Sequence, residues 1–179
     1  MPSRNPGRDP GHDSDSYGRV TDYTNANSGK SYNGGNSDDL ILGSQYNDTF
    51  SGGKGADRIE GGAGNDVLDG NRGSDTVKGG AGNDTITGGK GNDTLTGGTG
   101  SDTFIFERDD DKDVITDFDP GNDTILFEGF GNNRDSFNEI MNNASNQNGN
   151  VVINMGSGDE LTLEGLSKSD LSSDDFSFG

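Results

Sequence analysis

Eight aspartates recur at intervals of nine residues, and this spacing is the feature of the chain that most directly implies chemistry. Carboxylates are favoured ligands of hard divalent cations, and a regular array of them repels itself unless cations lie between its members. The spacing therefore points to repeated cation binding. The eight positions are Asp39, Asp48, Asp57, Asp66, Asp75, Asp84, Asp93 and Asp102.

Each aspartate is the sixth residue of a nine-residue unit of the form G-G-x-G-x-D-x-U-x, where U is apolar. Eight such units fill residues 34–105 without an insertion or deletion, and glycine takes the first place in every one of them. The eighth place is always apolar. Its occupants are Ile41, Phe50, Ile59, Leu68, Val77, Ile86, Leu95 and Phe104.

The unit specifies two elements that would position its aspartate. The last three places alternate polar, apolar and polar, which predicts a short strand with one side chain directed inward. The first six places predict a turn whose glycines, at places one, two and four, allow positive φ and let carbonyl groups point at a common centre. Two units then close one coil of 18 residues, and stacked coils form a parallel β-roll, an all-β fold.

Units that lie two apart share an edge of such a roll, so the aspartates divide into two rows. We call Asp39, Asp57, Asp75 and Asp93 the odd row, and Asp48, Asp66, Asp84 and Asp102 the even row. Paired strands would space the members of a row by about 4.8 Å.

Calcium fits such rows best, because Ca²⁺ accepts carboxylates and main-chain carbonyls together, whereas Mg²⁺ demands octahedral geometry. The absence of cysteine and the single histidine disfavour zinc and copper. Three gaps in each row predict up to six ions, and a metal-free chain that is largely disordered.

Composition excludes several classes of partner. The formal net charge of −19 argues against nucleic acid and anionic membranes. No apolar run is long enough for a membrane helix, and the N-terminal residues contain no apolar core of a secretory signal. Hydrophobic residues make up only 25% of the chain, so its core must be thin.

The nonapeptides resemble the repeats of the RTX (repeats-in-toxin, haemolysin-type calcium-binding) family. That resemblance implies a β-roll with Ca²⁺ in its turns and a secreted, extracellular protein exported by type I secretion machinery. Residues 102–130 are similar to the segment after the last repeat in serralysin-type proteases. The final stretch "DELTLEGLSKSDLSSDDFSF" is similar to C-termini that carry the uncleaved secretion signal.

Three regions are expected along the chain. Residues 1–33 are polar and predict a disordered leader or linker, residues 34–105 the β-roll, and residues 106–179 a β-rich C-terminal cap with the secretion signal. Within the cap, short strands are predicted at Val114–Phe118, Thr124–Phe127, Val151–Met155 and Leu161–Leu163, and a helical turn at Ser136–Met141.

The loop at residues 117–128 carries acidic residues at the spacing of an EF-hand: Asp117, Asp119, Asp123 and Glu128. Its glycine is one place early, and strand residues follow where a helix should begin. We therefore favour a polar hairpin turn, while a calcium ion bound in another geometry stays open.

Three basic residues, Lys54, Arg72 and Lys90, take the third turn place on one edge. One interpretation is a binding site for anionic polysaccharide, resembling the R-modules of alginate-modifying enzymes. The other, which we favour, is charge balance beside the aspartates.

The chain has neither the HExxH motif of zinc proteases nor a G-x-S-x-G elbow, so we predict no enzymatic activity. The leading hypothesis is a monomeric, non-catalytic calcium-binding module that folds after secretion. The alternatives are an accessory module of a secreted polysaccharide-modifying enzyme, protease or lipase, and an adhesion or matrix module.

Overall fold

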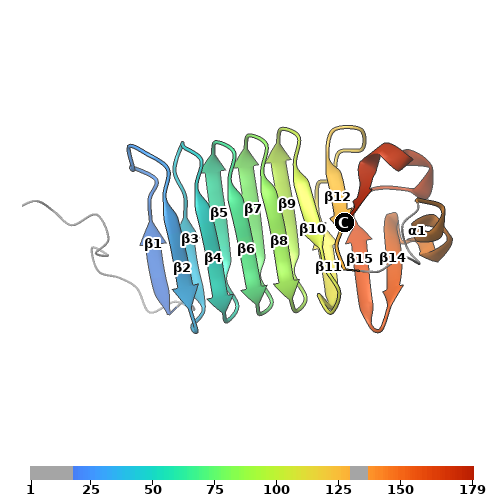
Figure 1. Ribbon diagram of the computed structural model, residues 1–179, viewed down its shortest axis with the longest axis horizontal. Helices are drawn as coiled ribbons and strands as arrows, with labels where there is room; N and C mark the ends of the chain where they lie inside the picture. Colours follow the sequence, from blue (N-terminus) through green and yellow to red (C-terminus); the bar gives the residue numbers. More distant parts are fainter. Residues whose placement is uncertain (1–17, 130–136) are drawn as a thin grey trace, which may run out of the picture.

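The computed structural model describes residues 18–129 and 137–179. Its centre is a parallel β-roll in which successive strands alternate between two facing sheets (Figure 1). The expectation of an all-β parallel roll with a β-rich cap is confirmed. The strands of the roll are β1 (Arg19–Asp22), β2 (Ser31–Gly35), β3 (Asp39–Leu42), β4 (Thr49–Lys54), β5 (Arg58–Ala63), β6 (Val67–Arg72), β7 (Thr76–Ala81), β8 (Thr85–Lys90), β9 (Thr94–Thr99), β10 (Thr103–Phe106), β11 (Lys112–Ile115) and β12 (Thr124–Phe127).

One sheet has the strand order β1-β3-β5-β7-β9-β11 and the other has β12-β10-β8-β6-β4-β2, with every one of these pairs parallel. The register offset between paired strands of the repeats is 18 residues, as in Ile59↔Val77 and Leu68↔Ile86. The strands are longer than the three places predicted, because most of them continue through the first three places of the next unit.

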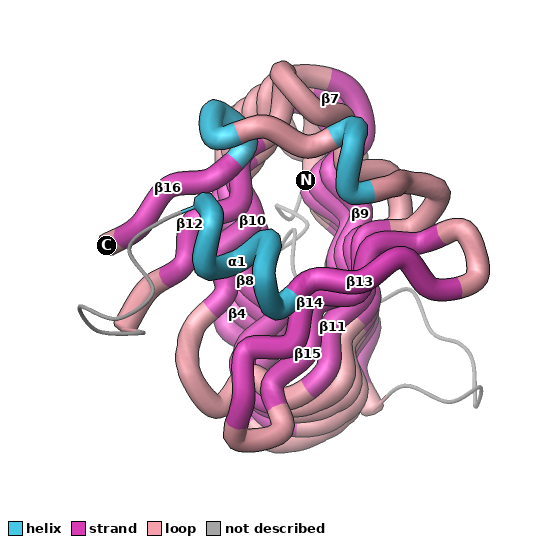
Figure 2. Tube along the Cα trace, turned by 90° about the vertical axis from the view of Figure 1, so that its right-hand side faces the viewer, coloured by secondary structure: helices cyan, strands magenta, loops and turns pink. Residues whose placement is uncertain are grey.

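The core is a narrow ladder of the eighth-place side chains. All eight, from Ile41 to Phe104, are at most 2% exposed, and the next coil continues the ladder with Ile115 and Ile125. Figure 2, which looks along the roll from its C-terminal end, shows the two sheets facing each other across this ladder.

The C-terminal region adds strands to the end of both sheets. Its elements are α1 (Phe137–Asn143), β13 (Ala144–Gln147), β14 (Asn150–Gly156), β15 (Asp159–Leu163), two 3-10 turns at Lys168–Asp170 and Ser173–Asp175, and β16 (Phe176–Phe178). An antiparallel meander of β13, β14 and β15 joins β11 through a parallel β15 pairing, and β16 pairs with β12. In Figure 2, α1 crosses the end of the roll.

The tail predictions differ in detail from the structure. The strand at Thr124–Phe127 has the predicted bounds, while the strand expected at Val114–Phe118 lies earlier, at Lys112–Ile115. Helix α1 begins at Phe137, and Ser136 lies outside the described residues. Parallel stacking also continues beyond Ile105, so the cap proper begins later than predicted.

The disordered leader predicted for residues 1–33 is wrong for residues 18–33, while residues 1–17 lie outside the described part of the chain. Strands β1 and β2 add one further pairing to each sheet. Packing of aromatic rings explains why this segment is ordered. The ring of Tyr23 stacks on Phe50 at 5.8 Å between centroids and meets Tyr32 edge-on at 6.3 Å. These rings cover the N-terminal end of the core ladder. Within the described residues no helix is long and apolar enough to cross a membrane.

Candidate metal centre

The structure assembles the aspartates into the two rows expected from the sequence. In the odd row, the main-chain N–H of Asp39 donates to Oδ1 of Asp57 at 2.7 Å, and the same bond joins Asp57 to Asp75 and Asp75 to Asp93. In the even row, the bonds from Asp48 to Asp66, Asp66 to Asp84 and Asp84 to Asp102 measure 2.7–2.8 Å. Each carboxylate thus ties its own turn to the turn one coil before it.

All eight aspartates are buried, with at most 2% of each residue exposed. In all of them except Asp48, Oδ2 is a buried acceptor without a hydrogen-bond partner among the described residues, whereas Oδ2 of Asp48 accepts from the N–H of Ser44 at 2.7 Å. Because buried polar atoms in native proteins are nearly always satisfied, this regular set of unpaired acceptors is consistent with cation binding. The unpaired atoms are Oδ2 of Asp39, Asp57, Asp66, Asp75, Asp84, Asp93 and Asp102, together with Oδ1 of Asp39.

The glycine at the first place makes room for the aspartate five residues later in every unit except the one that begins at Gly43, where a Cβ would meet the carbonyl oxygen of Gly61. A Cβ at Gly52 would collide with Oδ2 of Asp57, and one at Gly70 with Oδ2 of Asp75. These first-place glycines do not have positive φ, contrary to the prediction from the sequence; that conformation belongs to places two and four. The first glycine therefore leaves space for the carboxylate, and the glycines at places two and four provide the positive φ of the turn.

Burial makes these carboxyl groups hard to ionise without a cation. It raises the pKa of Asp75 to about 7 and the pKa values of Asp66, Asp93 and Asp102 to about 6, against an ordinary value of 3.8. The main-chain N–H bond to each carboxylate opposes the rise in pKa. The neighbouring aspartates of the row add to the rise for Asp66, Asp75 and Asp102. A divalent ion would remove both the burial penalty and the repulsion.

Within the described residues, no three acidic or histidine side chains converge closely enough to enclose a metal ion by themselves. Each gap in a row offers two carboxylates, so the other ligands of an ion there would be main-chain carbonyl oxygens of the turns or water. This donor set of carboxylate and carbonyl oxygens suits Ca²⁺ better than a transition metal.

The model of the RTX calcium-binding nonapeptide repeat, four copies long, matches residues 33–68 and again residues 69–104. These residues are RTX calcium-binding repeats. A search of curated proteins gives no match.

Among solved structures, the chain is similar to the AlgE6R2 subunit of the mannuronan C5-epimerase from Azotobacter vinelandii, with a TM-score of 0.51, 27% identity, and coverage of 77% of this chain and 91% of that one. The AlgE6R3 subunit of the same epimerase gives a TM-score of 0.46 at 27% identity, covering 83% and 77%.

The extracellular lipase LipA from Serratia marcescens gives a TM-score of 0.44 at 20% identity, covering 79% of this chain. The chain spans only 40% of the length of that lipase.

Both rows extend beyond the RTX repeats, which sequence reasoning missed. The main-chain N–H of Asp93 donates to Oδ1 of Asp113, and that of Asp102 to Oδ1 of Asp123, both at 2.9 Å. A signal was present, because "KDVIT" and "NDTIL" repeat the D-x-U pattern. At the N-terminal end Lys30 takes the place of an aspartate, and its main-chain N–H donates to Oδ1 of Asp48.

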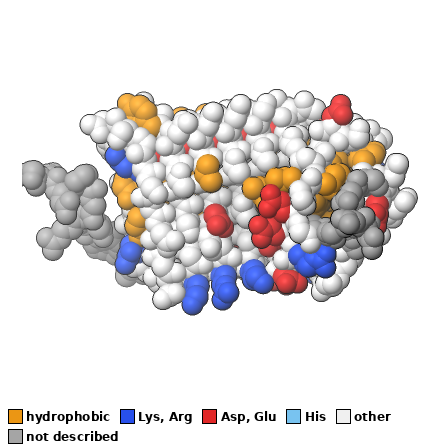
Figure 3. All heavy atoms as spheres, viewed as in Figure 1, with side chains coloured by type: hydrophobic (Ala, Val, Ile, Leu, Met, Phe, Trp, Pro, Cys, Tyr) orange, Lys and Arg blue, Asp and Glu red, His pale blue; other side chains and the backbone are white. Residues whose placement is uncertain are grey.

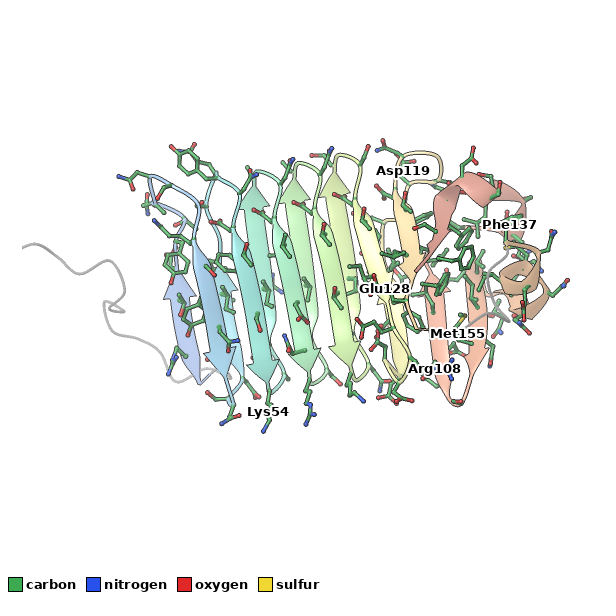
Figure 4. All side chains as sticks on the ribbon, in the orientation of Figure 1. Lys54, Arg108, Asp119, Glu128, Phe137 and Met155 are labelled. Carbon is green, nitrogen blue, oxygen red and sulfur yellow. The ribbon has the colours of Figure 1, made fainter. Side chains whose placement is uncertain are left out.

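The hairpin turn predicted at residues 117–128 is wrong. Strands β11 and β12 belong to opposite sheets, so the segment between them is a crossing between sheets. The carboxylate of Asp117 accepts the N–H groups of Gly97 and Gly98 at 2.9 Å, while Asp123 belongs to the even row. Asp119 and Glu128 lie apart from each other (Figure 4), so the four acidic residues form no EF-hand.

The three basic residues of the third turn place do form a row. Lys54 pairs in register with Arg72, and Arg72 with Lys90, and all three are exposed. Figure 3 shows basic side chains gathered along one long edge of the roll, the edge on which Figure 4 labels Lys54. On the other edge the same turn place holds neutral residues: Gln45, Ala63, Ala81 and Thr99.

Proposed function

We propose that the chain is a non-catalytic calcium-binding module in which Ca²⁺ occupies the gaps between successive aspartates of each row. The observation that carries the proposal is the series of buried Oδ2 atoms without a partner among the described residues, which repeats with the period of the nonapeptides. The ligands would be Asp39, Asp57, Asp75 and Asp93 on one edge and Asp48, Asp66, Asp84 and Asp102 on the other, with main-chain carbonyl oxygens of the turns completing each set.

Calcium then determines whether the roll is folded. The eight-residue core ladder is thin, and the buried carboxylates oppose folding when ionised, so the metal-free chain is expected to be largely unfolded at neutral pH. Extracellular calcium modules bind their ions at roughly 10⁻⁴–10⁻³ M, far above cytosolic concentrations. A chain of this kind stays unfolded inside the cell, as export by type I machinery requires, and folds in the extracellular medium.

Far-UV circular dichroism during a calcium titration tests this function. We expect a disordered spectrum in chelator and a cooperative rise in β signal with Ca²⁺, but no such rise with Mg²⁺ at equal concentration. The variant Asp75→Asn removes a central carboxylate and should raise the calcium midpoint, whereas Asp174→Asn, an exposed aspartate outside both rows, should leave it unchanged. A chain that is fully folded in chelator at neutral pH contradicts the proposal.

A second candidate function is that of an accessory module that binds anionic polysaccharide. The register of Lys54, Arg72 and Lys90 favours it, because it aligns three exposed basic side chains on neighbouring strands, about 4.8 Å apart along the sheet, where a linear anion can contact each in turn. Lys90 also lies 3.9 Å from Asp109. The similarity to a subunit of a mannuronan C5-epimerase supports the same class of ligand. The parent protein would then be a secreted polysaccharide-modifying enzyme.

Binding of alginate to the calcium-loaded module, measured by calorimetry, tests the second candidate. The triple variant of Lys54, Arg72 and Lys90 to glutamine should lose binding, while Lys78→Gln, an exposed lysine outside the row, should retain it. Equal binding by the triple variant and the wild type means that the row only balances charge beside the aspartates.

A further inference from the structure

The turn at residues 108–113, outside the RTX match, has the shape of a repeat turn without its sequence. Asp111 forms a parallel bridge with Gly91, and Ile115 pairs with Leu95, so "RDDDKD" lies in register with "GGKGND" of the preceding coil at an offset of 20 residues. Asp113 thus takes the sixth place and Ile115, which is 1% exposed, takes the eighth. This is a ninth unit, placed after a two-residue insertion.

Its backbone conformation also matches. Asp109 and Asp111 have φ values of 65° and 66°, at the two places where the preceding turn has Gly89 at 90° and Gly91 at 134°. A non-glycine residue in this region costs about 1–3 kcal/mol, although aspartate tolerates it better than most. The left-handed turn therefore persists even where its glycines are lost.

The carboxylates of this turn are buried against the end of the odd row. Asp110 is 3% exposed and Asp113 is 2% exposed, and Asp93, whose N–H donates to Asp113, keeps a buried Oδ2 without a partner among the described residues. Among the basic residues of the two turns, Lys112 lies 3.5 Å from Glu160, Lys90 lies 3.9 Å from the exposed carboxylate of Asp109, and Nε of Arg108 donates to the carbonyl oxygen of Gly129 at 3.2 Å. Buried carboxylates that lie side by side require a cation or a proton.

We propose that the gap between Asp93 and Asp113 binds an additional divalent cation, which extends the odd row beyond the nonapeptides. Calcium is the ion that suits two carboxylates and the main-chain carbonyl oxygens of the two turns, and Asp110 adds negative charge beside them. The proposal rests on the function proposed above, because it assumes that the gaps of the rows bind ions.

This site would join the roll to its cap. The N–H of Glu160, in β15, donates to the carbonyl oxygen of Asp111 at 2.8 Å, and Asp159 Oδ2 accepts from the N–H of Asp109 at 3.3 Å. Strand β11, which begins directly before Asp113, pairs with β15 along its whole length. An ion that orders this turn therefore also orders the surface on which the cap meander docks.

A crystal of the wild-type chain grown in calcium and soaked with terbium provides the direct test. Anomalous scattering should give a peak between Asp93 and Asp113 in addition to peaks in the nonapeptide gaps. Peaks in the nonapeptide gaps with none at Asp113 overturn this proposal and leave the proposed function intact. A crystal with no peak in either row contradicts both this proposal and the proposed function.

Variants give the same information in solution. Native mass spectrometry at saturating calcium should count one ion fewer for Asp113→Asn than for the wild type. Asp109→Asn is the matched control, because it removes one charge from the same turn at an exposed side chain, and asparagine tolerates the same φ. An unchanged count for a folded Asp113→Asn overturns the proposal, and where that variant does not fold the wild-type crystal decides.

Discussion

The side chain of Asn65 accepts, at Oδ1, a hydrogen bond of 3.0 Å from the main-chain N–H of Asn83, one coil further along the roll. The bond is part of a ladder: the N–H of Asn65 donates in the same way to Asn47, and that of Ser101 to Asn83. All lie at the fifth place of the even-edge turns. These turns are therefore tied together without an ion.

Among the described residues, the odd edge has no continuous ladder of this kind. Asp38 accepts from the N–H of Ala56 at 2.8 Å, but the alanine side chain has no acceptor for the next coil. We predict that Ala56→Asn, which supplies one, lowers the calcium midpoint of folding by stabilising the roll by about 0.5–1.5 kcal/mol. A calcium titration followed by circular dichroism measures the effect.

Ala81→Asn is the control for that substitution, because it adds the same side chain at an exposed third turn place outside the ladder. It should leave the midpoint near that of the wild type. Equal midpoints for the Ala56→Asn variant and the control mean that the ladder adds nothing to the stability of the turns.

Gly91, at the fourth place of a turn, is predicted to be irreplaceable. Its φ is +134°, and a Cβ there would collide with the main-chain carbonyl oxygen of Gly73. Gly91→Ala should therefore lower stability by more than about 3 kcal/mol, since a backbone clash adds to the conformational strain. Urea unfolding at saturating calcium measures the loss.

Gly35→Ala separates the two contributions to that loss. Gly35 has a similar φ of +119°, but nothing lies within 4 Å of a Cβ there. Strain alone should cost this variant about 1–2 kcal/mol. Similar losses for both variants would show that the close approach of neighbouring coils is unimportant.

The regular part of the fold could be predicted because a fixed period determines register. Once every ninth residue repeats, residues 18 apart must pair, and the two aspartate rows and the apolar ladder result from that pairing. The ninth unit could not be found in this way, because an insertion shifts Asp113 out of the count and aspartates replace the glycines at places two and four.

The start of the roll was not predicted from the sequence for a different reason. Lys30 occupies the place of an aspartate, and polar composition suggested disorder for the residues around it. What orders this segment is the stacking of Tyr23 on Phe50 and the pairing of Tyr32 with the same residue. Tyr23 and Tyr32 lie 18 and 9 residues before Ile41 and so continue the spacing of the eighth-place residues, but the first-place glycine and the sixth-place aspartate of the unit are absent there.

The core ladder is predicted to be as necessary for the stability of the roll as the aspartates are. Leu68 is 1% exposed and lies between the eighth-place residues of the neighbouring coils, Phe50 and Ile86. Leu68→Ala should cost about 2–5 kcal/mol of stability in the calcium-loaded state, because neighbouring coils cannot move together to fill the cavity. Urea unfolding with excess calcium is the measurement.

Val67 supplies the control from the same strand. Its side chain points to the outer face and the residue is 48% exposed, so Val67→Ala should change the unfolding free energy by less than about 0.5 kcal/mol. A loss at Val67 as large as at Leu68 would contradict a single inward ladder.

Proton binding should replace calcium in part, because both neutralise the same carboxylates. Because these pKa values are raised in the folded state, folding takes up protons, and the bound protons stabilise the folded, metal-free chain. This stabilisation is fully present below the pKa of the unfolded chain, about 3.8. It is lost as the pH rises through about 6 for Asp66, Asp93 and Asp102, about 7 for Asp75 and Asp110, and about 9 for Asp113, where burial is the main cause of each shift.

We therefore expect calcium-free protein to gain β signal on acidification from about pH 7 to pH 4.5, and calcium-loaded protein to need more calcium for folding below about pH 6. Circular dichroism of metal-stripped protein across this range measures the first effect, and calcium titrations at about pH 5.5 and about pH 7.5 measure the second. If the calcium midpoint were the same at both pH values, protons and calcium would not compete for the carboxylates, and the rows could not be the binding sites.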